Sequence, residues 1–258
     1  MKKESTLKIV TAIAFLAMIF VNYLANALPL GGITTGEASD MYPNLFTPAG
    51  ITFSIWGVIY LFLLGFTIYQ FKTPKDKKRA QTLAKLRKLY LATSLANIAW
   101  IFAWHYQIIW LSVIIMITLL TLLIFIAELI NTEKYSLKET VLVRIPFSIY
   151  FGWITVATIA NITVFLVSIN WDGLGISDDI WAVYVLLVGA AIGICRTVKN
   201  QNLYYGSVFV WAYAGILLKH TSSTGFSNAY PNIVSTVIIC LILFITTMSA
   251  VGLSKIKE

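Results

Sequence analysis

The chain has 258 residues, of which 59% are hydrophobic and only 12% are charged, and its formal net charge is +8. An ordinary soluble domain carries about 25% charged residues. Together with a mean hydropathy of +0.81, this composition excludes a soluble enzyme, a nucleic-acid-binding domain and a disordered chain, and it indicates an integral membrane protein.

Eight apolar runs follow one another along the chain, and each is a candidate membrane-crossing helix. A helix needs about 20 apolar residues to cross the hydrocarbon core of a bilayer. The runs are 9–28, 50–71, 89–106, 108–130, 145–169, 180–195, 203–218 and 233–253. The sixth and seventh are the shortest and fall just below the usual minimum of about 17 residues. The pattern predicts an all-α integral membrane protein with eight spans.

The basic residues predict how these spans are oriented. All but one of the 19 lysines and arginines lie before the first run, after the last run, or in the segments 72–88, 134–144 and 196–199. With eight spans these positions share one side of the membrane, and an excess of positive charge marks the cytoplasmic side. Both termini are therefore predicted to be cytoplasmic. The basic segment 72–88 is predicted to be a loop that anchors the topology or binds anionic lipid.

Aromatic and amide side chains, rather than charges, occupy the middle of the predicted spans. An asparagine that faced lipid would lack hydrogen-bond partners, so each should face protein or a ligand cavity. Helical spacing places such side chains on one face of each of three spans. The three faces are Phe53, Trp56 and Tyr60; Asn97, Trp100 and Trp104; and Trp153, Ala157 and Asn161. The residues alone leave two interpretations open: packing with interhelical hydrogen bonds, or a shared aromatic pocket for a flat apolar ligand.

Five short motifs resemble one family when they are taken in chain order. The motifs are Tyr42-Pro-Asn-Leu45, Thr47-Pro48, Phe53-Ser-Ile-Trp56-Gly-Val-Ile-Tyr60, Asn97-Ile-Ala-Trp100 and Trp153-Ile-Thr-Val-Ala157-Thr158-Ile-Ala-Asn161. They are similar to the W-Y-x-x-L, proline-rich, F…W-x-x-x-Y, L-N-x-x-W and W-x-x-x-A-T-x-x-N patterns of the TspO/MBR family, the tryptophan-rich sensory proteins related to the mitochondrial translocator protein. The chain departs from the family where Met41 replaces a tryptophan and where the proline-rich segment is shorter.

The resemblance covers about residues 8–170 and carries an expected fold and an expected site. It implies a TspO-like five-helix bundle over residues 1–170. The last three apolar runs have no counterpart in that five-helix family, and they predict a three-helix membrane extension over residues 171–258. It also implies a pocket that binds tetrapyrroles or sterol-like ligands. By similarity, the residues that line or support this pocket are Trp56, Tyr60, Asn97, Trp100, Trp153, Ala157 and Asn161, and the shared helix faces add Phe53 and Trp104.

We therefore expect a TspO-type ligand-binding or sensory protein in a bacterial plasma membrane. The implied ligand is a tetrapyrrole, either a porphyrin or haem, held in the outer half of the membrane, and no cofactor is required. The expected partners are membrane lipid and the hydrophobic small molecule. A homodimer is compatible with the sequence, and nucleic acid is not expected as a partner. Cys195 and Cys240 lie in separate apolar runs, so their spacing predicts neither a disulfide framework nor a metal site.

Three alternative functions stay open. A permease or permease subunit for a small hydrophobic solute would need a break in mid-membrane, and no run shows paired Gly/Pro interruptions. An enzyme acting on a lipid or a porphyrin would need titratable groups near the pocket, where only Tyr60, Tyr150 and His105 qualify. A structural partner of another membrane protein could use Gly189 and Gly193, whose G-x-x-x-G spacing allows close helix packing.

Overall fold

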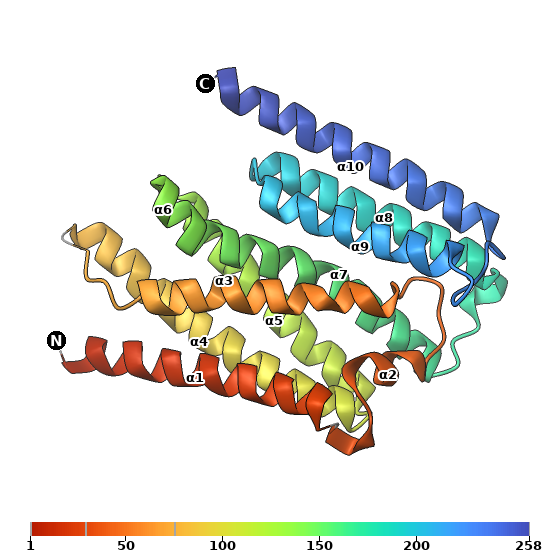
Figure 1. Ribbon diagram of the computed structural model, residues 1–258, viewed down its shortest axis with the longest axis horizontal. Helices are drawn as coiled ribbons and strands as arrows, with labels where there is room; N and C mark the ends of the chain where they lie inside the picture. The colour runs from red at the N-terminus through yellow and green to blue at the C-terminus, as the bar shows by residue number, and fades with distance from the viewer. Residues whose placement is uncertain (1, 29, 75, 258) are drawn as a thin grey trace. The chain divides into compact units, whose positions relative to one another are not determined.

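The computed structural model describes residues 2–28, 30–74 and 76–257, and within these residues all regular structure is helical. One long helix lies over each of the eight predicted runs (Figure 1). These helices are α1 (Lys2–Ala27), α3 (Ile55–Tyr69), α4 (Lys77–His105), α5 (Ile109–Asn131), α7 (Ile145–Ser168), α8 (Asp178–Lys199), α9 (Leu203–Thr221) and α10 (Pro231–Lys257). The predicted all-α membrane fold is confirmed.

Short helical turns connect or extend the long helices. They are η1 (Leu30–Gly32), α2 (Thr35–Asp40), η2 (Gly50–Ser54), α6 (Leu137–Glu139), the π-helical turn η3 (Thr140–Arg144) and η4 (Gly173–Gly175). The turn η2 runs directly into α3, and η3 runs directly into α7. Both irregular turns therefore lie at the start of a long helix rather than in its middle.

Six helical segments in the described part of the chain are long and apolar enough to cross a membrane. They are Glu4–Gly32, Gly50–Tyr69, Ile109–Asn131, Leu137–Ser168, Asp178–Lys199 and Pro231–Lys255. The two predicted spans outside this set lie in α4, which begins with a basic segment, and in α9, which is short and rich in tyrosine. The crossing of the membrane by α4 and α9, the count of eight spans and the cytoplasmic termini stay predictions.

The basic segment 72–88 is mostly helix, which corrects its interpretation as a loop. Helix α4 begins at Lys77, because the side chain of Asp76 accepts a hydrogen bond from the backbone N–H of Arg79 at 2.7 Å and caps the first turn. Leu83 and Leu86 are buried on one face of this added stretch. Lys75 of the same segment lies outside the described residues. The basic charge is therefore carried largely by a packed helix.

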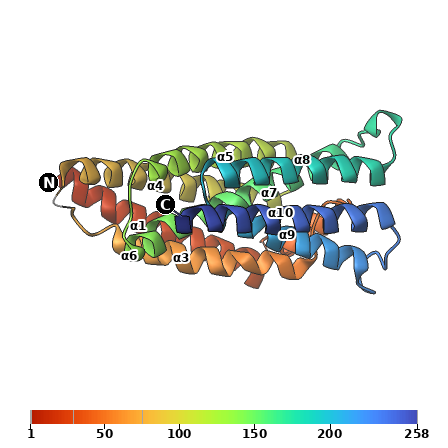
Figure 2. The same cartoon turned by 90° about the horizontal axis from the view of Figure 1, so that it is seen from above.

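Two compact units make up the chain, and the first comprises Met1–Ala38 and Trp56–Phe151. Within it α4 packs along α1 and along α5 (Figures 1 and 2). A cluster of buried rings fills the interior: the ring of Phe66 lies edge-on to those of Tyr90 and Phe147, with centroids 5.2 and 4.7 Å apart. Close edge-to-face pairs of this kind add to the stability that burial alone provides.

One end of this first unit carries basic side chains that bond back to the protein. Arg87 is fully buried, yet its guanidinium donates to the carbonyl of Gln70 at 3.1 Å and pairs with Glu4 at 3.1 Å. Lys8 donates to the carbonyl of Phe71 at 3.2 Å. These bonds tie the start of α1 to the segment that follows α3. Within this unit the start of α1 and the 70–73 segment therefore share one end, as their common basic charge predicts.

The second unit comprises Ser39–Ile55 and Gly152–Glu258. In it α8, α9 and α10 pack against one another. A Cβ added to Gly189 would lie 2.7 Å from the hydroxyl of Tyr213, and one added to Gly193 would lie 2.7 Å from the ring of Phe209. The G-x-x-x-G spacing therefore serves close packing within this chain. The unit boundary divides α7 between Phe151 and Gly152, and the predicted division at residue 170 stays a prediction.

Candidate functional site

An amide at the centre of the first unit connects three helices. Asn97 on α4 is fully buried. Its side-chain oxygen accepts a hydrogen bond from the amide of Asn22 on α1 at 2.7 Å, and its side-chain nitrogen donates to the hydroxyl of Tyr150 on α7 at 3.4 Å. A buried amide needs such partners because leaving it unpaired is costly. The role of Asn97 seen here is interhelical hydrogen bonding, one of the two interpretations that the sequence left open.

A stacked aromatic pair on α3 lies beside this amide network. The rings of Trp56 and Tyr60 are 5.4 Å apart and nearly parallel, at 22°, and the ring of Tyr150 meets Trp56 edge-on at 5.9 Å. Trp56 and Tyr60 are both half-buried. The hydroxyl oxygen of Tyr60 is buried, and it has no hydrogen-bond partner among the described residues. Such a group calls for an explanation, because native proteins pair nearly all their buried polar atoms.

A second stacked aromatic pair lies in the last turns of α4. The rings of Trp100 and Trp104 are 5.4 Å apart at 20°, and both side chains are buried. The indole N–H of Trp104 donates to the carbonyl of Thr35 at 3.2 Å. Gly31, with φ at +69°, brings its backbone close to His105, where an added Cβ would lie 3.1 Å from the carbonyl oxygen. Trp104 therefore anchors the segment that follows α1.

The other four predicted site residues belong to the second unit. Phe53 and Trp153 meet edge-on there, with ring centroids 5.8 Å apart at 86°. Trp153 and Asn161 are buried, and Ala157 is partly exposed. The structure therefore brings together Trp56, Tyr60 and Asn97 through Tyr150 in one unit, and Phe53 with Trp153 in the other. A single pocket lined by all nine predicted residues stays a prediction.

Asn22, Tyr150 and Thr35 take part in this arrangement, and the site prediction omitted all three. Tyr150 contacts both Trp56 and Asn97, although the sequence singled it out only as a titratable group. Its position three residues before Trp153 places it on the same side of α7 as the predicted face, and this spacing is the signal that could have found it. Thr35 offers no such signal, because it contributes a backbone carbonyl to Trp104.

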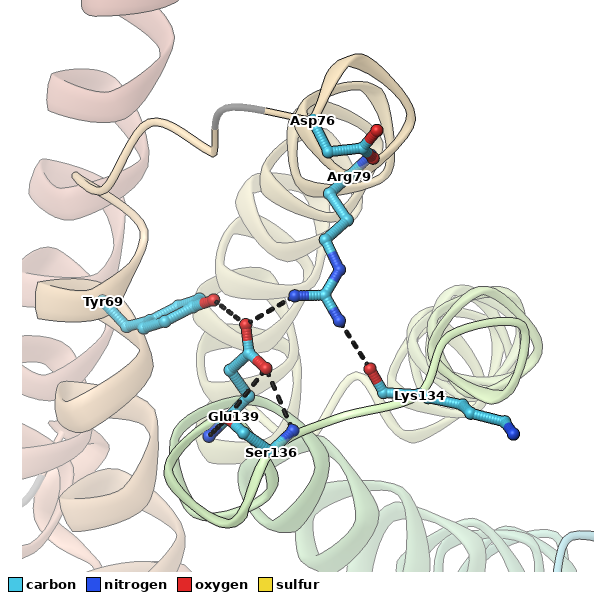
Figure 3. A network of polar contacts seen from close by, with 6 residues as sticks. All are labelled: Tyr69, Asp76, Arg79, Lys134, Ser136 and Glu139. Atoms are coloured by element: carbon cyan, nitrogen blue, oxygen red, sulfur yellow. Dashed lines mark hydrogen bonds and ion pairs between the residues drawn. The ribbon is translucent and has the colours of Figure 1, made fainter.

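At the basic end of the first unit, Glu139 is the centre of a polar network (Figure 3). One carboxylate oxygen accepts from the hydroxyl of Tyr69 and from the guanidinium of Arg79, both at 3.1 Å. The other accepts from the backbone N–H of Ser136 at 3.0 Å, which completes a capping box at the start of α6. Arg79 also donates to the carbonyl of Lys134 at 2.7 Å. The network thus ties the end of α3, the segment that follows α5 and the short helix α6 to the first turn of α4.

This network borders a cavity of about 440 Å³. Apolar side chains line it together with charges of both signs, and among the lining residues are Lys72, Leu83, Leu86, Glu133, Tyr135 and Val143. Burial, with the charge of Glu133 nearby, raises the pKa of Tyr135. Both charges at the centre of the network, Arg79 and Glu139, already have partners. The network therefore has a structural role, which is to hold these segments of the chain together.

Comparison with known proteins finds a matching family model. A family model described as TSPO-like protein matches residues 8–250, which includes almost all of the last three long helices. The match thus continues well beyond residue 170, where the resemblance carried by the motifs ends. No curated protein and no solved structure matches the chain. In the described part of the chain no three His, Cys, Asp or Glu side chains are grouped so that they could hold a metal ion.

Proposed function

Because the chain belongs to the TSPO-like protein family, we propose that it is a ligand-binding or sensory membrane protein that stacks a flat hydrophobic ligand, such as a tetrapyrrole, on Trp56 and Tyr60. The observation that carries this proposal is the buried hydroxyl of Tyr60, which lacks a partner among the described residues beside a half-buried indole. A buried unpaired hydroxyl costs about 1–3 kcal/mol. A polar atom on a bound ligand would recover that cost.

The ring geometry supports a flat ligand. Trp56 and Tyr60 are nearly parallel, so they offer one continuous π surface, and a conjugated ring gains both apolar burial and offset stacking on such a surface. The edge-on contact of Tyr150 and the amide of Asn97 behind it hold the indole in place. Trp100 and Trp104 are buried in the interior of the same unit. Phe53, Trp153, Ala157 and Asn161 are proposed as ligand contacts from the family resemblance.

The permease alternative receives no comparable support. Transporters place broken helices at the bilayer midplane, where unwound backbone binds the substrate. Here the irregular turns η2 and η3 precede α3 and α7, so they lie at helix starts. Binding without translocation therefore agrees better with the helices as they are built.

The test is a titration of protoporphyrin IX against the purified protein in nanodiscs. Trp56→Ala should weaken binding roughly tenfold to hundredfold, because about 1–3 kcal/mol of apolar burial is lost. Tyr60→Phe should weaken binding about twofold to tenfold through one lost hydrogen bond. The same change should leave the ligand-free protein equally stable or more stable, because it removes an unpaired buried group.

Trp110→Ala is the matched control, because Trp110 on α5 is 58% exposed and lies outside the proposed surface. It should leave affinity within about twofold of the parent, since a side chain on the lipid-facing side makes no ligand contact. If Trp56→Ala folds and binds protoporphyrin like the parent, the proposal is wrong. If Tyr60→Phe destabilises the ligand-free protein, the hydroxyl has a partner and the supporting observation is lost.

A further inference from the structure

A second cavity, of about 280 Å³, lies within the second unit at the end of α7. Three parts of the unit line it: the segment 43–46, the stretch from the last turns of α7 to the first turns of α8, and the turn between α9 and α10. Five of the lining residues are aromatic. They are Phe46, Trp171, Trp181, Phe226 and Tyr230. None of Trp171, Trp181, Phe226 and Tyr230 is among the predicted site residues.

Ring contacts build two of the aromatic walls. Trp171 and Trp181 are 4.9 Å apart at 60° on one wall. Phe226 and Tyr230 meet edge-on at 5.4 Å on another. The faces of such rings carry negative charge density, which attracts a cation, and tryptophan attracts it most strongly.

Specific bonds hold these walls in place. The indole N–H of Trp181 donates to the carbonyl of Gly173 at 2.6 Å. Gly173 has a φ angle of +65°, and it has no room for a side chain, because a Cβ atom there would lie 2.9 Å from the same indole. On the other side, His220 donates through Nε2 to the carbonyl of Leu45 at 3.0 Å and packs on Phe226 at 4.8 Å. The cavity is therefore preformed, which lowers the entropy cost of binding.

The charge at the cavity is negative. Asp178 lines it in the first turn of α8, and among the described residues that line it there is no lysine, arginine or histidine. Lys219, the basic residue of the α9–α10 end, is paired with Asp40 at 3.6 Å. Together, Asp178 and Asp179 outweigh the partial positive charge that the start of a helix provides.

We propose that this cavity binds a small organic cation, with its methylammonium group among the rings of Trp171, Trp181 and Tyr230 and with Asp178 as the counter-charge. Its volume lies just under the usual range of about 300–1,000 Å³ for ligand sites, so the occupant is a small cation or a headgroup rather than a macrocycle. Aromatic enclosure beside a carboxylate is the chemistry that recognises quaternary ammonium. The ligand is either free in solution or the choline headgroup of a phospholipid.

The test compares choline with its uncharged isostere 3,3-dimethylbutan-1-ol by calorimetry, using the full chain in phosphatidylglycerol nanodiscs at constant ionic strength. Choline should bind at least tenfold more tightly than the isostere, because only choline carries the charge. Trp181→Leu should weaken choline binding roughly fivefold to thirtyfold through the lost cation–π contact. Trp171→Leu, at a side chain that is 37% exposed, gives a second variant if Trp181→Leu does not fold.

Asp178→Asn and Asp179→Asn form a matched pair in the same helical turn. Of the two, Asp178 lines the cavity, whereas the carboxylate of Asp179 accepts a hydrogen bond from the side-chain amide of Asn232 at 3.4 Å. Asp178→Asn should weaken choline binding about twofold to fivefold, and Asp179→Asn should weaken it less. Equal affinities for choline and the isostere, or no binding of either, would overturn the proposal. So would unchanged choline binding in both folded tryptophan variants.

A further arm distinguishes the two sources of the cation. If the occupant is a lipid headgroup, phosphatidylcholine nanodiscs should weaken the apparent affinity for added choline by competition. If it is a free amine, the lipid should not matter. Neither Trp56 nor Tyr60 is among the lining residues of this cavity, so failure here leaves the tetrapyrrole proposal untouched.

Discussion

Replacement of Asn97 by alanine tests how much of the first unit depends on one buried amide. The change removes a 2.7 Å hydrogen bond from Asn22 and a 3.4 Å hydrogen bond to Tyr150. Asn22 keeps a second bond, to the carbonyl of Met18 at 2.9 Å, so part of its amide stays satisfied. Interhelical hydrogen bonds in membrane proteins contribute on average about 0.6 kcal/mol and at most about 1.7 kcal/mol.

The expected loss in the free energy of unfolding for Asn97→Ala is therefore about 1–3 kcal/mol. The lower figure follows from two bonds of average strength, and the upper one adds the cost of leaving buried groups of Asn22 and Tyr150 unpaired. The assay is unfolding of the detergent-solubilised protein by increasing SDS, followed by tryptophan fluorescence. A double-mutant cycle with Asn22→Ala should give a coupling of about 0.5 kcal/mol or more.

Asn26→Ala is the matched control for this experiment. Asn26 is exposed, and its amide donates only within its own helix, to the carbonyl of Asn22 at 3.0 Å. It should change stability by less than about 0.5 kcal/mol. The reasoning is refuted if Asn97→Ala is no more destabilising than Asn26→Ala and shows no coupling to Asn22. A loss of protoporphyrin affinity at unchanged stability would then assign the Asn97 amide to the ligand.

Three more outcomes are expected. Gly193→Ala should destabilise the protein by about 1–3 kcal/mol, because the new Cβ would lie 2.7 Å from Phe209 and 2.8 Å from Phe244; Gly57→Ala, which meets no atom within 4 Å, should not. Burial lowers the pKa of His220 below 6.5, so the unfolded chain takes up a proton first as the pH falls. Stability should therefore decline below about pH 6.5 and decline less in His220→Gln, as measured by SDS unfolding across pH. In a Cys195→Ala background, an impermeant thiol reagent added outside cells should label Ser177→Cys and Ser223→Cys but not Lys77→Cys; labelling at residue 77 would contradict the predicted orientation.

Local properties of the sequence determined the helices of this protein. A run of about 20 apolar residues indicates a helix that is long enough to cross a bilayer and that lies in lipid. The reason is that a lipid environment leaves the backbone few alternatives to the helix. The eight predicted runs therefore each coincide with a helix. The basic charge of residues 72–88 predicts a loop, and this prediction is wrong, because a local cap at Asp76 and the burial of Leu83, Leu86 and Arg87 extend α4 into the segment.

The helix faces were also visible in the sequence, but their partners were not. Spacing placed Asn97, Trp100 and Trp104 on one side of α4, and only the tertiary structure showed that the Asn97 amide bonds to Asn22 and Tyr150. The same holds for Gly189 and Gly193, whose spacing predicted close packing without showing that α9 and α10 provide it. Periodicity is a property of one helix, whereas a contact depends on the placement of two.

The aromatic cavity of the second unit shows most clearly what only the tertiary structure decided. Trp171 and Trp181 flank one predicted outer loop, and by sequence they are ordinary interfacial aromatics. Phe226 and Tyr230 lie about 50 residues away, and the two pairs become walls of one cavity only when α7, α8 and the α9–α10 turn are assembled. Local sequence sets where each ring lies along its helix or turn, but long-range packing sets which rings enclose a common space.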